Sequence, residues 1–373
     1  MSLARQSPDS SRSLTQLANG VARSFAISLR ALPSALRTPV TLAYLLARAS
    51  DAVADSVNES MPLAADVAQR LQALDDLGRA IERSTDAPGQ TDSDLSGVLA
   101  LIESVPDPRE QQLLRATPEL LTILSRQTAV DRALIAEACQ EIVSGQRLDL
   151  TRFGMAGPEV RALAHTEDLH DYTWRVAGCV GSFWTRMCES HLADWRQAEL
   201  TAMLLAAGEY GRALQRLNIL RDSAADLRHG RCYWPENELQ AVGWTPQQLA
   251  INVRHARLEE LIRMQPLMQQ WVAQTRLGLG HGLAYCQAIR PWRLRWASAL
   301  PALIGLRTLE CIEALGPLAL TQPVKVERRW IKGLLLRLVL GAGTPAGLLK
   351  LGRELGLPRD ACVLPTLDGT IQP

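Results

Sequence analysis

Apolar residues recur every three or four positions along almost the whole chain, and this spacing constrains the fold more than any other feature. Residues at these spacings share one face of an α-helix, whereas a half-buried strand shows strict alternation, which is scarce here. The sequence therefore predicts an all-α protein. Its apolar fraction of 47% in 373 residues can fill a sizeable core. Because no stretch has the composition of a linker, we predict a single domain over 1–373, with its core at about 14–354 and polar tails.

Glycine and proline clusters separate the predicted helices. The helices are expected over 13–30, 37–56, 61–84, 94–104, 107–126, 129–147, 158–191, 194–227, 246–278, 283–315 and 326–354. The glycine groups at 278–282 and 341–347 are interpreted as helix breaks, because neither has the spacing or the preceding strand of a dinucleotide-binding loop.

Composition excludes several classes of function. The net charge is +1, so the chain lacks the basic excess that is typical of nucleic-acid-binding proteins. Seven cysteines without a CxxC pair argue against a disulfide framework or a zinc site and indicate reduced thiols in a cytosolic protein. The six histidines show no spacing typical of a transition-metal site.

The polar N-terminus lacks the apolar stretch of a secretory signal. The apolar run at 338–349 is shorter than the roughly 20 residues that a bilayer-spanning helix needs. It is interpreted either as an interrupted core helix or as a segment that rests on a membrane surface. We predict a cytoplasmic protein, with transient contact to the membrane surface as the second interpretation.

Two acidic motifs have the same form, Asp51-Ala-Val-Ala-Asp55 and Asp222-Ser-Ala-Ala-Asp226. On a helix, positions i and i+4 lie about 6 Å apart on one face, so each motif places two carboxylates side by side. Such a pair is self-repelling unless a cation lies between the carboxylates. Oxygen ligands of this kind suit Mg²⁺, which takes its remaining ligands from water and substrate phosphates.

Polar side chains extend both acidic motifs along their helices. Tyr44 and Arg48 precede the first motif at helical spacing, and Gln215, Asn218 and Arg221 precede the second. Two interpretations remain open. The stripes form either a buried salt-bridge network between two helices, or a cavity that holds Mg²⁺ and a diphosphate. Charge balance favours the cavity, because four carboxylates and a diphosphate together require several Mg²⁺ ions and arginines.

Four blocks in the same order resemble the squalene and phytoene synthase family of head-to-head prenyl transferases, and the resemblance is greatest to its bacterial-type squalene synthases. The blocks are ARSF from Ala22, YLLARASDAVADS from Tyr44, YTWRVAGCVG from Tyr172 and LQRLNILRDSAADLRHGRCYWP from Leu214. The resemblance implies an isoprenoid synthase fold, a single helical bundle around a central cavity.

Carried over residue by residue, the resemblance also implies a site. The implied Mg²⁺ ligands are Asp51, Asp55, Asn218, Asp222 and Asp226. The implied diphosphate-binding residues are Arg23, Ser24, Phe25, Arg48, Gln215, Asn218, Arg221 and Arg231. Tyr44 and Tyr172 would border the reacting carbons and, with the aspartates, form the catalytic set. This chain has Ala52 and Ser56 where many relatives carry a further acidic residue, so weaker metal binding is expected there.

A C-terminal segment, PVKVERRWIK from Pro323, resembles the part of squalene synthases that places basic residues for NADPH. Lys325, Arg328 and Arg329 are the implied NADPH-binding residues. A solvated basic helix start is the alternative interpretation.

The resemblance implies a squalene synthase that uses Mg²⁺ and NADPH and acts on two molecules of farnesyl diphosphate through presqualene diphosphate. An enzyme without the reductive step, forming phytoene, dehydrosqualene or presqualene diphosphate, is the alternative. A non-catalytic assembly protein is less favoured, because both acidic pairs are intact and an uncompensated acidic cluster is costly. The sequence does not determine the oligomeric state.

Overall fold

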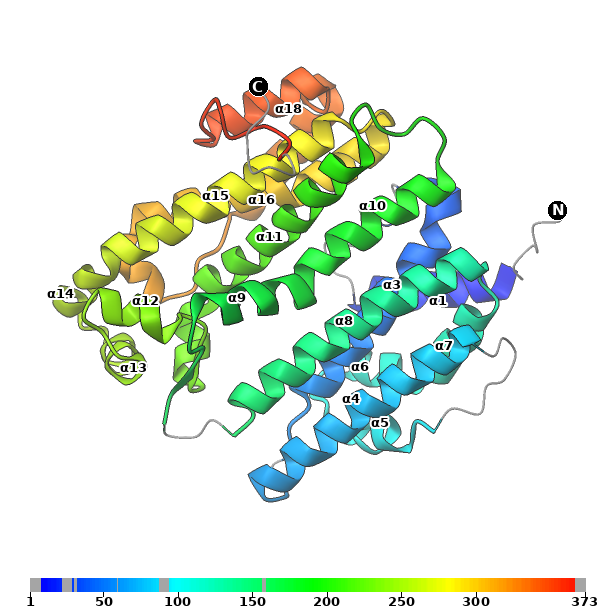
Figure 1. Ribbon diagram of the computed structural model, residues 1–373, viewed down its shortest axis with the longest axis horizontal. Coiled ribbons are helices and arrows are strands. Elements are labelled where there is room, and N and C mark those ends of the chain that lie inside the picture. Colours follow the sequence, from blue (N-terminus) through cyan, green and yellow to red (C-terminus); the bar gives the residue numbers. More distant parts are fainter. Residues whose placement is uncertain are drawn as a thin grey trace. The chain divides into compact units, whose positions relative to one another are not determined.

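The computed structural model describes residues 8–21, 29, 32–58, 60–86, 94–155 and 159–365. Most of these residues are helical and strands are few and short, which confirms the predicted all-α class (Figure 1). The chain divides into two compact units. Unit 1 is formed by Met1–Thr151 and Arg186–Ala193, and unit 2 by Arg152–Thr185 and Asp194–Pro373. The prediction of a single domain over 1–373 stays a prediction.

Unit 1 is built around helix α3, which packs against α1, α4, α6 and α7. Its elements are α1 (Pro8–Val21), α3 (Ser34–Asp55), α4 (Leu63–Asp86), α5 (Ser96–Ala100), the 3₁₀ turn η1 (Ile102–Ser104), α6 (Pro108–Arg115), α7 (Thr117–Ser125), most of α8 (Ala129–Phe153) and the end of α10 (Cys179–His191). Leu42, Leu45 and Leu46 of α3 have no exposed surface. Burying each one contributes roughly 1.5–3 kcal/mol, so α3 is fixed firmly by its apolar side.

Unit 2 is built around helix α11, which packs against α15, α16 and the π-helical turn η2. Its elements are β1 (Arg161–Ala162), α9 (Thr166–Thr173), η2 (Trp174–Gly178), the start of α10, α11 (Leu200–Arg228), β2 (Arg231–Cys232), α12 (Glu236–Ala241), α13 (Pro246–Arg254), α14 (Leu258–Leu261), η3 (Ile262–Met264), α15 (Gln265–Gln287), α16 (Trp292–Leu315), η4 (Gly316–Leu320), α17 (Arg328–Arg337), the π-helical turn η5 (Leu338–Ala342) and α18 (Pro345–Glu354). Figure 1 shows α11 and α15 running side by side.

Gly278 and Gly282 lie inside α15, so the prediction of a helix break at 278–282 is wrong. A Cβ atom on Gly278 would lie 2.6 Å from the Cβ of Ala213 on α11, and one on Gly282 would overlap the ring of Tyr210. The two glycines therefore allow α15 and α11 to approach closely. This packing outweighs the roughly 1 kcal/mol that each glycine costs in helix propensity.

The helix predicted over 158–191 is divided in the structure. Strand β1 pairs in parallel with β2, and α9, η2 and α10 follow it. Asp168 helps to begin α9, because its carboxylate accepts a hydrogen bond from the backbone N–H of His165 at 3.0 Å. A π-helical turn inside a helix adds a residue and is frequent at functional sites.

The helix predicted over 326–354 is also interrupted. The π-helical turn η5, followed by Gly343 and Thr344, separates α17 from α18. Thr344 then begins α18, because its hydroxyl accepts from the N–H of Gly347 at 3.1 Å. Among the described residues, no helix is long and apolar enough to cross a membrane.

Candidate active site

The first acidic motif lies at the end of α3. Tyr44, Arg48 and Asp51 line a cavity of about 360 Å³ together with Asp107 and Glu110, which lie at the start of α6. Unit 1 thus brings three predicted site residues to one cavity. Asp55, the other carboxylate of the motif, is exposed.

Arg48 is shared between two carboxylates. Its Nη1 lies 3.3 Å from Oδ2 of Asp51, and its Nη2 pairs with Glu110. About a third of the Arg48 side chain is exposed. A partly exposed ion-pair network therefore joins α3 to α6 and borders the cavity.

Burial raises the pKa of Asp51 from 3.8 to about 6; the Arg48 guanidinium opposes this shift and the Asp55 carboxylate adds to it. The Asp51 side chain keeps 32% of its surface exposed, at the cavity. Ionising this carboxyl is costly without further positive charge, because the single arginine does not offset the lost hydration. A carboxylate of this kind is a candidate cation ligand.

Gln146 of α8 holds the other oxygen of Asp51. Its Nε2 donates to Oδ1 of Asp51 at 2.5 Å. Sequence reasoning missed both Gln146 and Glu110, which lie 95 residues from Asp51 and 62 residues from Arg48. No local spacing relates either residue to the acidic motif, so only the packing of the helices reveals them.

The second acidic motif lies in a polar row along α11. The Nδ2 of Asn218 donates to Oε1 of Gln215 at 3.2 Å. One turn later, Nε and Nη2 of Arg221 donate to the two oxygens of Asp222 at 2.9 and 2.6 Å. Asp226 follows at the next turn and is half-buried. All five predicted residues of this helix therefore form one row within unit 2.

Tyr172 approaches this row from α9. Its hydroxyl accepts from Nε2 of Gln215 at 3.5 Å, and the residue is 8% exposed. The ring stacks on Tyr233 with centroids 5.2 Å apart, and Phe153 contacts Tyr233 edge-on at 5.0 Å. Tyr233 and Phe153 complete an aromatic cluster that sequence reasoning did not assign to the site.

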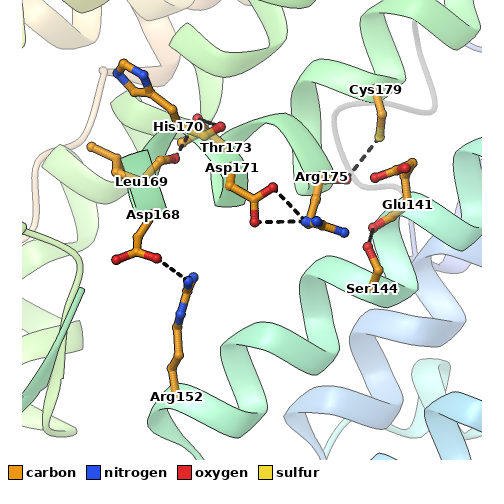
Figure 2. A network of polar contacts seen from close by, with 10 residues as sticks. All are labelled: Glu141, Ser144, Arg152, Asp168, Leu169, His170, Asp171, Thr173, Arg175 and Cys179. Atoms are coloured by element: carbon orange, nitrogen blue, oxygen red, sulfur yellow. Dashed lines mark hydrogen bonds and ion pairs between the residues drawn. The ribbon is translucent and has the colours of Figure 1, made fainter. Parts of the chain in front are cut away.

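Ion pairs fix the helix that carries Tyr172 (Figure 2). Arg175 donates through Nε to both oxygens of Asp171 at 2.9 Å, which ties η2 to α9. Arg152, near the end of α8, donates to Asp168 at 2.6 Å. The Arg175 pair is local to one helical turn, whereas the Arg152 pair connects the first turn of α9, the helix that carries Tyr172, to the end of α8.

Close backbone packing brings α9, η2 and α10 against α11. A Cβ atom on Gly181 would overlap the backbone carbonyl of Ala207, and one on Gly211 would overlap that of Ala177. The glycines of the VAGCVG segment are thus explained by the close approach of two helices. This approach places Tyr172 beside Gln215.

Arg231 is half-buried in β2, where it is the register partner of Arg161 in β1. Arg23, Ser24 and Phe25, which the resemblance assigns to diphosphate binding, lie outside the described residues.

The three residues assigned to NADPH lie at the start of α17. Lys325, Arg328 and Arg329 are all exposed, and Arg329 pairs with Glu327. The structure brings them together at one helix N-terminus, but shows no further contact that distinguishes a nucleotide site from a solvated surface.

The donor atoms fit a hard cation. Among the described residues, no three Asp, Glu, His or Cys side chains converge to hold a metal ion by themselves. Mg²⁺ needs only one or two protein carboxylates, because waters and phosphate oxygens complete its shell. Asp51 on α3 and Asp222 with Asp226 on α11 meet that requirement, each in its own unit.

Solved structures with the same isoprenoid synthase fold include squalene synthases and a dehydrosqualene synthase. The structure of TcSQS in complex with the ligand E5700 has a TM-score of 0.73 and 22% identity, covering 94% of this chain and 90% of that chain. The squalene synthase HpnC from Alicyclobacillus acidocaldarius has a TM-score of 0.56 and 18% identity, covering 83% and 94%. These similarities confirm the predicted fold.

Sequence comparisons identify the family. The bifunctional lycopene cyclase/phytoene synthase of Colletotrichum graminicola is 29% identical over 61% of this chain and 35% of its own length. The squalene synthase of Schizosaccharomyces pombe is 28% identical over 61% of this chain and 45% of its own length. The chain thus spans about a third to a half of these relatives. The family model for squalene/phytoene synthase matches residues 18–330, and the chain belongs to this family.

Proposed function

We propose that the protein is a squalene synthase, which couples two molecules of farnesyl diphosphate head to head through presqualene diphosphate and then forms squalene. One observation carries the proposal. In each unit an acidic motif places an arginine directly on its aspartate, Arg48 on Asp51 and Arg221 on Asp222. A metal diphosphate needs both groups, because carboxylates bind the metal and guanidinium groups bind phosphate oxygens.

When bound, Mg²⁺ withdraws charge from the diphosphate so that it can leave, and NADPH supplies the reducing equivalents for the last step. The residues proposed to hold Mg²⁺ are Asp51, Asp55, Asn218, Asp222 and Asp226. The residues proposed to hold the diphosphates are Arg23, Ser24, Phe25, Arg48, Gln215, Asn218, Arg221 and Arg231. In the polar row of α11, Asn218 donates to Gln215 and Arg221 donates to Asp222.

The arginines have a role beyond binding. Negative charge grows on the diphosphate as the allylic C–O bond breaks, and a guanidinium already fixed in place stabilises that charge without reorganisation. Arg221 is fixed by its two bonds to Asp222, and Arg48 by Asp51 and Glu110. A diphosphate would accept hydrogen bonds from the same guanidinium groups.

The tyrosines are suited to the carbocation that this reaction produces. Tyr172 and Tyr233 present stacked aromatic rings, and aromatic faces attract cations. Tyr172 is buried, and burial excludes the water that would quench a carbocation. We propose that Tyr172 borders the reacting carbons and assists removal of the proton, and that Tyr44 has the corresponding position at the cavity of unit 1.

Lys325, Arg328 and Arg329 support the reductive step. Their exposed positive charges lie at the N-terminal end of α17, where backbone N–H groups also favour an anion. The ribose phosphate of NADPH is an anion that clustered basic residues recognise.

A product assay tests the proposal. Purified protein is incubated with farnesyl or geranylgeranyl diphosphate and Mg²⁺, with and without NADPH, and the products are extracted into hexane. We expect squalene from farnesyl diphosphate with NADPH, and presqualene diphosphate without it. Phytoene from geranylgeranyl diphosphate, independent of NADPH, would instead support the second candidate, which the phytoene synthases among the relatives favour. Absence of diphosphate release from both substrates would support a non-catalytic role.

A further inference from the structure

The solvent side of α17 and η5 changes character along its length. It begins with exposed basic residues, Arg328, Arg329 and Lys332. It ends with exposed apolar side chains: Leu336 is 60% exposed, Val339 68% and Leu340 76%. The opposite side of the same segment is apolar because it packs on unit 2, where Leu334 and Leu338 are buried. The apolar residues on the solvent side have no such explanation within the described chain.

Trp292, on the neighbouring helix α16, is a further exposed apolar residue. It lies at the start of α16 and is 61% exposed. One turn later, Nη1 of Arg295 lies 3.5 Å from the backbone oxygen of Gly343, the residue after η5. The start of α16 therefore meets the end of η5. We call Trp292, Leu336, Val339 and Leu340 the α17 surface.

Basic side chains outnumber acidic ones around the α17 surface, where Glu327 pairs with Arg329 at the start of the helix. Residues 328–353 contain six arginines and lysines and no aspartate or glutamate. Glu354 follows, and it pairs with Arg337 at 2.6 Å. Arg290 and Arg293 on either side of Trp292 are exposed as well. The surface combines apolar side chains with a basic surround, although the whole chain is almost neutral.

We propose that the α17 surface docks onto an anionic lipid bilayer, with Trp292, Leu336, Val339 and Leu340 inserted at the level of the headgroups. Apolar and tryptophan side chains flanked by lysine and arginine are typical of segments that lie in the membrane interface. Each basic residue near the membrane contributes attraction to anionic headgroups. A second copy of the chain fits less well, because a symmetric contact would place two basic surfaces against each other. The inference is independent of the proposed function.

Vesicle flotation tests the proposal with the full chain. The vesicles contain either phosphatidylcholine alone or phosphatidylcholine with phosphatidylglycerol. We expect binding to the anionic vesicles and at least about tenfold weaker partitioning of the triple variant Leu336→Ser, Val339→Ser and Leu340→Ser. The matched control is Val130→Ser, Ile262→Ser and Leu277→Ser, which removes exposed apolar side chains elsewhere and should bind like the unaltered chain. Circular dichroism verifies folding; if the triple variant does not fold, Leu340→Ser alone repeats the test.

A charge variant separates the two contributions. Arg293→Glu with Lys332→Glu should reduce binding to anionic vesicles severalfold, and the remaining binding should depend less on salt. Equal flotation of the serine triple variant and the unaltered chain would overturn the proposal, as would the absence of binding to anionic vesicles. It would also be overturned if the α17 surface only joined two copies, seen in light scattering as a dimer that the serine variant converts to a monomer without any vesicle binding.

Discussion

Gln146 donates a hydrogen bond from Nε2 to Oδ1 of Asp51 at 2.5 Å and so joins α8 to the acidic motif of α3. Arg48 holds the other carboxylate oxygen. Asp51 is therefore oriented from two sides before any ligand arrives. For a proposed metal ligand such as Asp51, a contact that orients the carboxylate supports metal binding without touching the metal, and loss of such a contact commonly weakens metal affinity.

Replacing Gln146 tests that role. In Gln146→Leu we expect the Mg²⁺ concentration for half-maximal turnover to rise about fivefold, since one hydrogen bond of about 1 kcal/mol is lost. The control is Gln140→Leu, two turns earlier on α8, where the amide bonds Gly78 rather than an aspartate. Magnesium titrations of both variants measure the effect. Equal magnesium dependence in the two variants would show that the Gln146 contact only supports packing.

The aspartates themselves are expected to be indispensable. Asp51→Asn or Asp222→Asn should lower turnover by at least about a thousandfold, because a neutral amide binds Mg²⁺ weakly and charge stabilisation of several kcal/mol is lost. Helical content, measured by circular dichroism, should stay unchanged. Asp360→Asn, an exposed position near the C-terminus, is the control. Full activity of either active-site variant would exclude the proposed metal ligands.

The reductive step is expected to depend on the start of α17. The double variant Lys325→Ala and Arg328→Ala should still form presqualene diphosphate but yield at least about tenfold less squalene at limiting NADPH, because two charged contacts to a phosphate are removed. The control is Lys350→Ala with Arg353→Ala, which removes two exposed positive charges from α18. The ratio of the two products is measured chromatographically. An unchanged ratio would place the NADPH site elsewhere.

Asp51 should make the metal-free protein less stable at neutral pH than at acidic pH. Its pKa is about 6 in the folded protein and 3.8 as the ordinary value, so the folded state resists ionisation. The loss of folding free energy caused by ionising Asp51 is absent below about pH 4, grows between about pH 4 and 6, and is complete above about pH 6. Because a third of the side chain is exposed, we expect Asp51→Asn to raise the free energy of unfolding by about 1–2 kcal/mol at pH 7.5 and little at pH 4. Urea unfolding of the variant and the unaltered chain in EDTA measures this difference in the free energy of unfolding. A variant that is less stable than the unaltered chain at pH 7.5 would contradict the prediction.

The close approach of α15 and α11 gives a stability prediction. Gly278→Ala should cost about 1–3 kcal/mol, because the new methyl group would lie 2.6 Å from the Cβ of Ala213. Gly333→Ala on α17 meets no atom within 4 Å and should stabilise by about 0.5–1 kcal/mol through helix propensity. Thermal unfolding of both variants measures the contrast. Equal effects would mean that the helices adjust their separation.

The sequence predicted the features that depend on nearby residues. The helices over 37–56 and 61–84 agree with α3 and α4 within two or three residues at each end, because apolar periodicity is a local signal. The polar row of α11 was predicted for the same reason, since Gln215 and Asp226 lie on one helix. The family resemblance rested on these same local blocks.

Features that depend on contacts between distant helices were missed. The break expected at 278–282 is absent, because packing against α11 makes glycine favourable inside α15. The π-helical turn η2 and the β1–β2 pair escaped detection, since neither has a periodic signal of useful length. Gln146 and Glu110 are ordinary surface residue types, and only the fold brings them to Asp51 and Arg48.

The pairing of Arg221 with Asp222 has a consequence for the order in which ligands bind. A magnesium ion that bound Asp222 by itself would leave the Arg221 guanidinium without its counterion. A diphosphate that bound Arg221 by itself would leave the Asp222 carboxylate unpaired. When the two arrive as one complex, every charge exchanges one partner for another. We therefore expect strong synergy, with free diphosphate and free magnesium each binding poorly and each raising the affinity of the other.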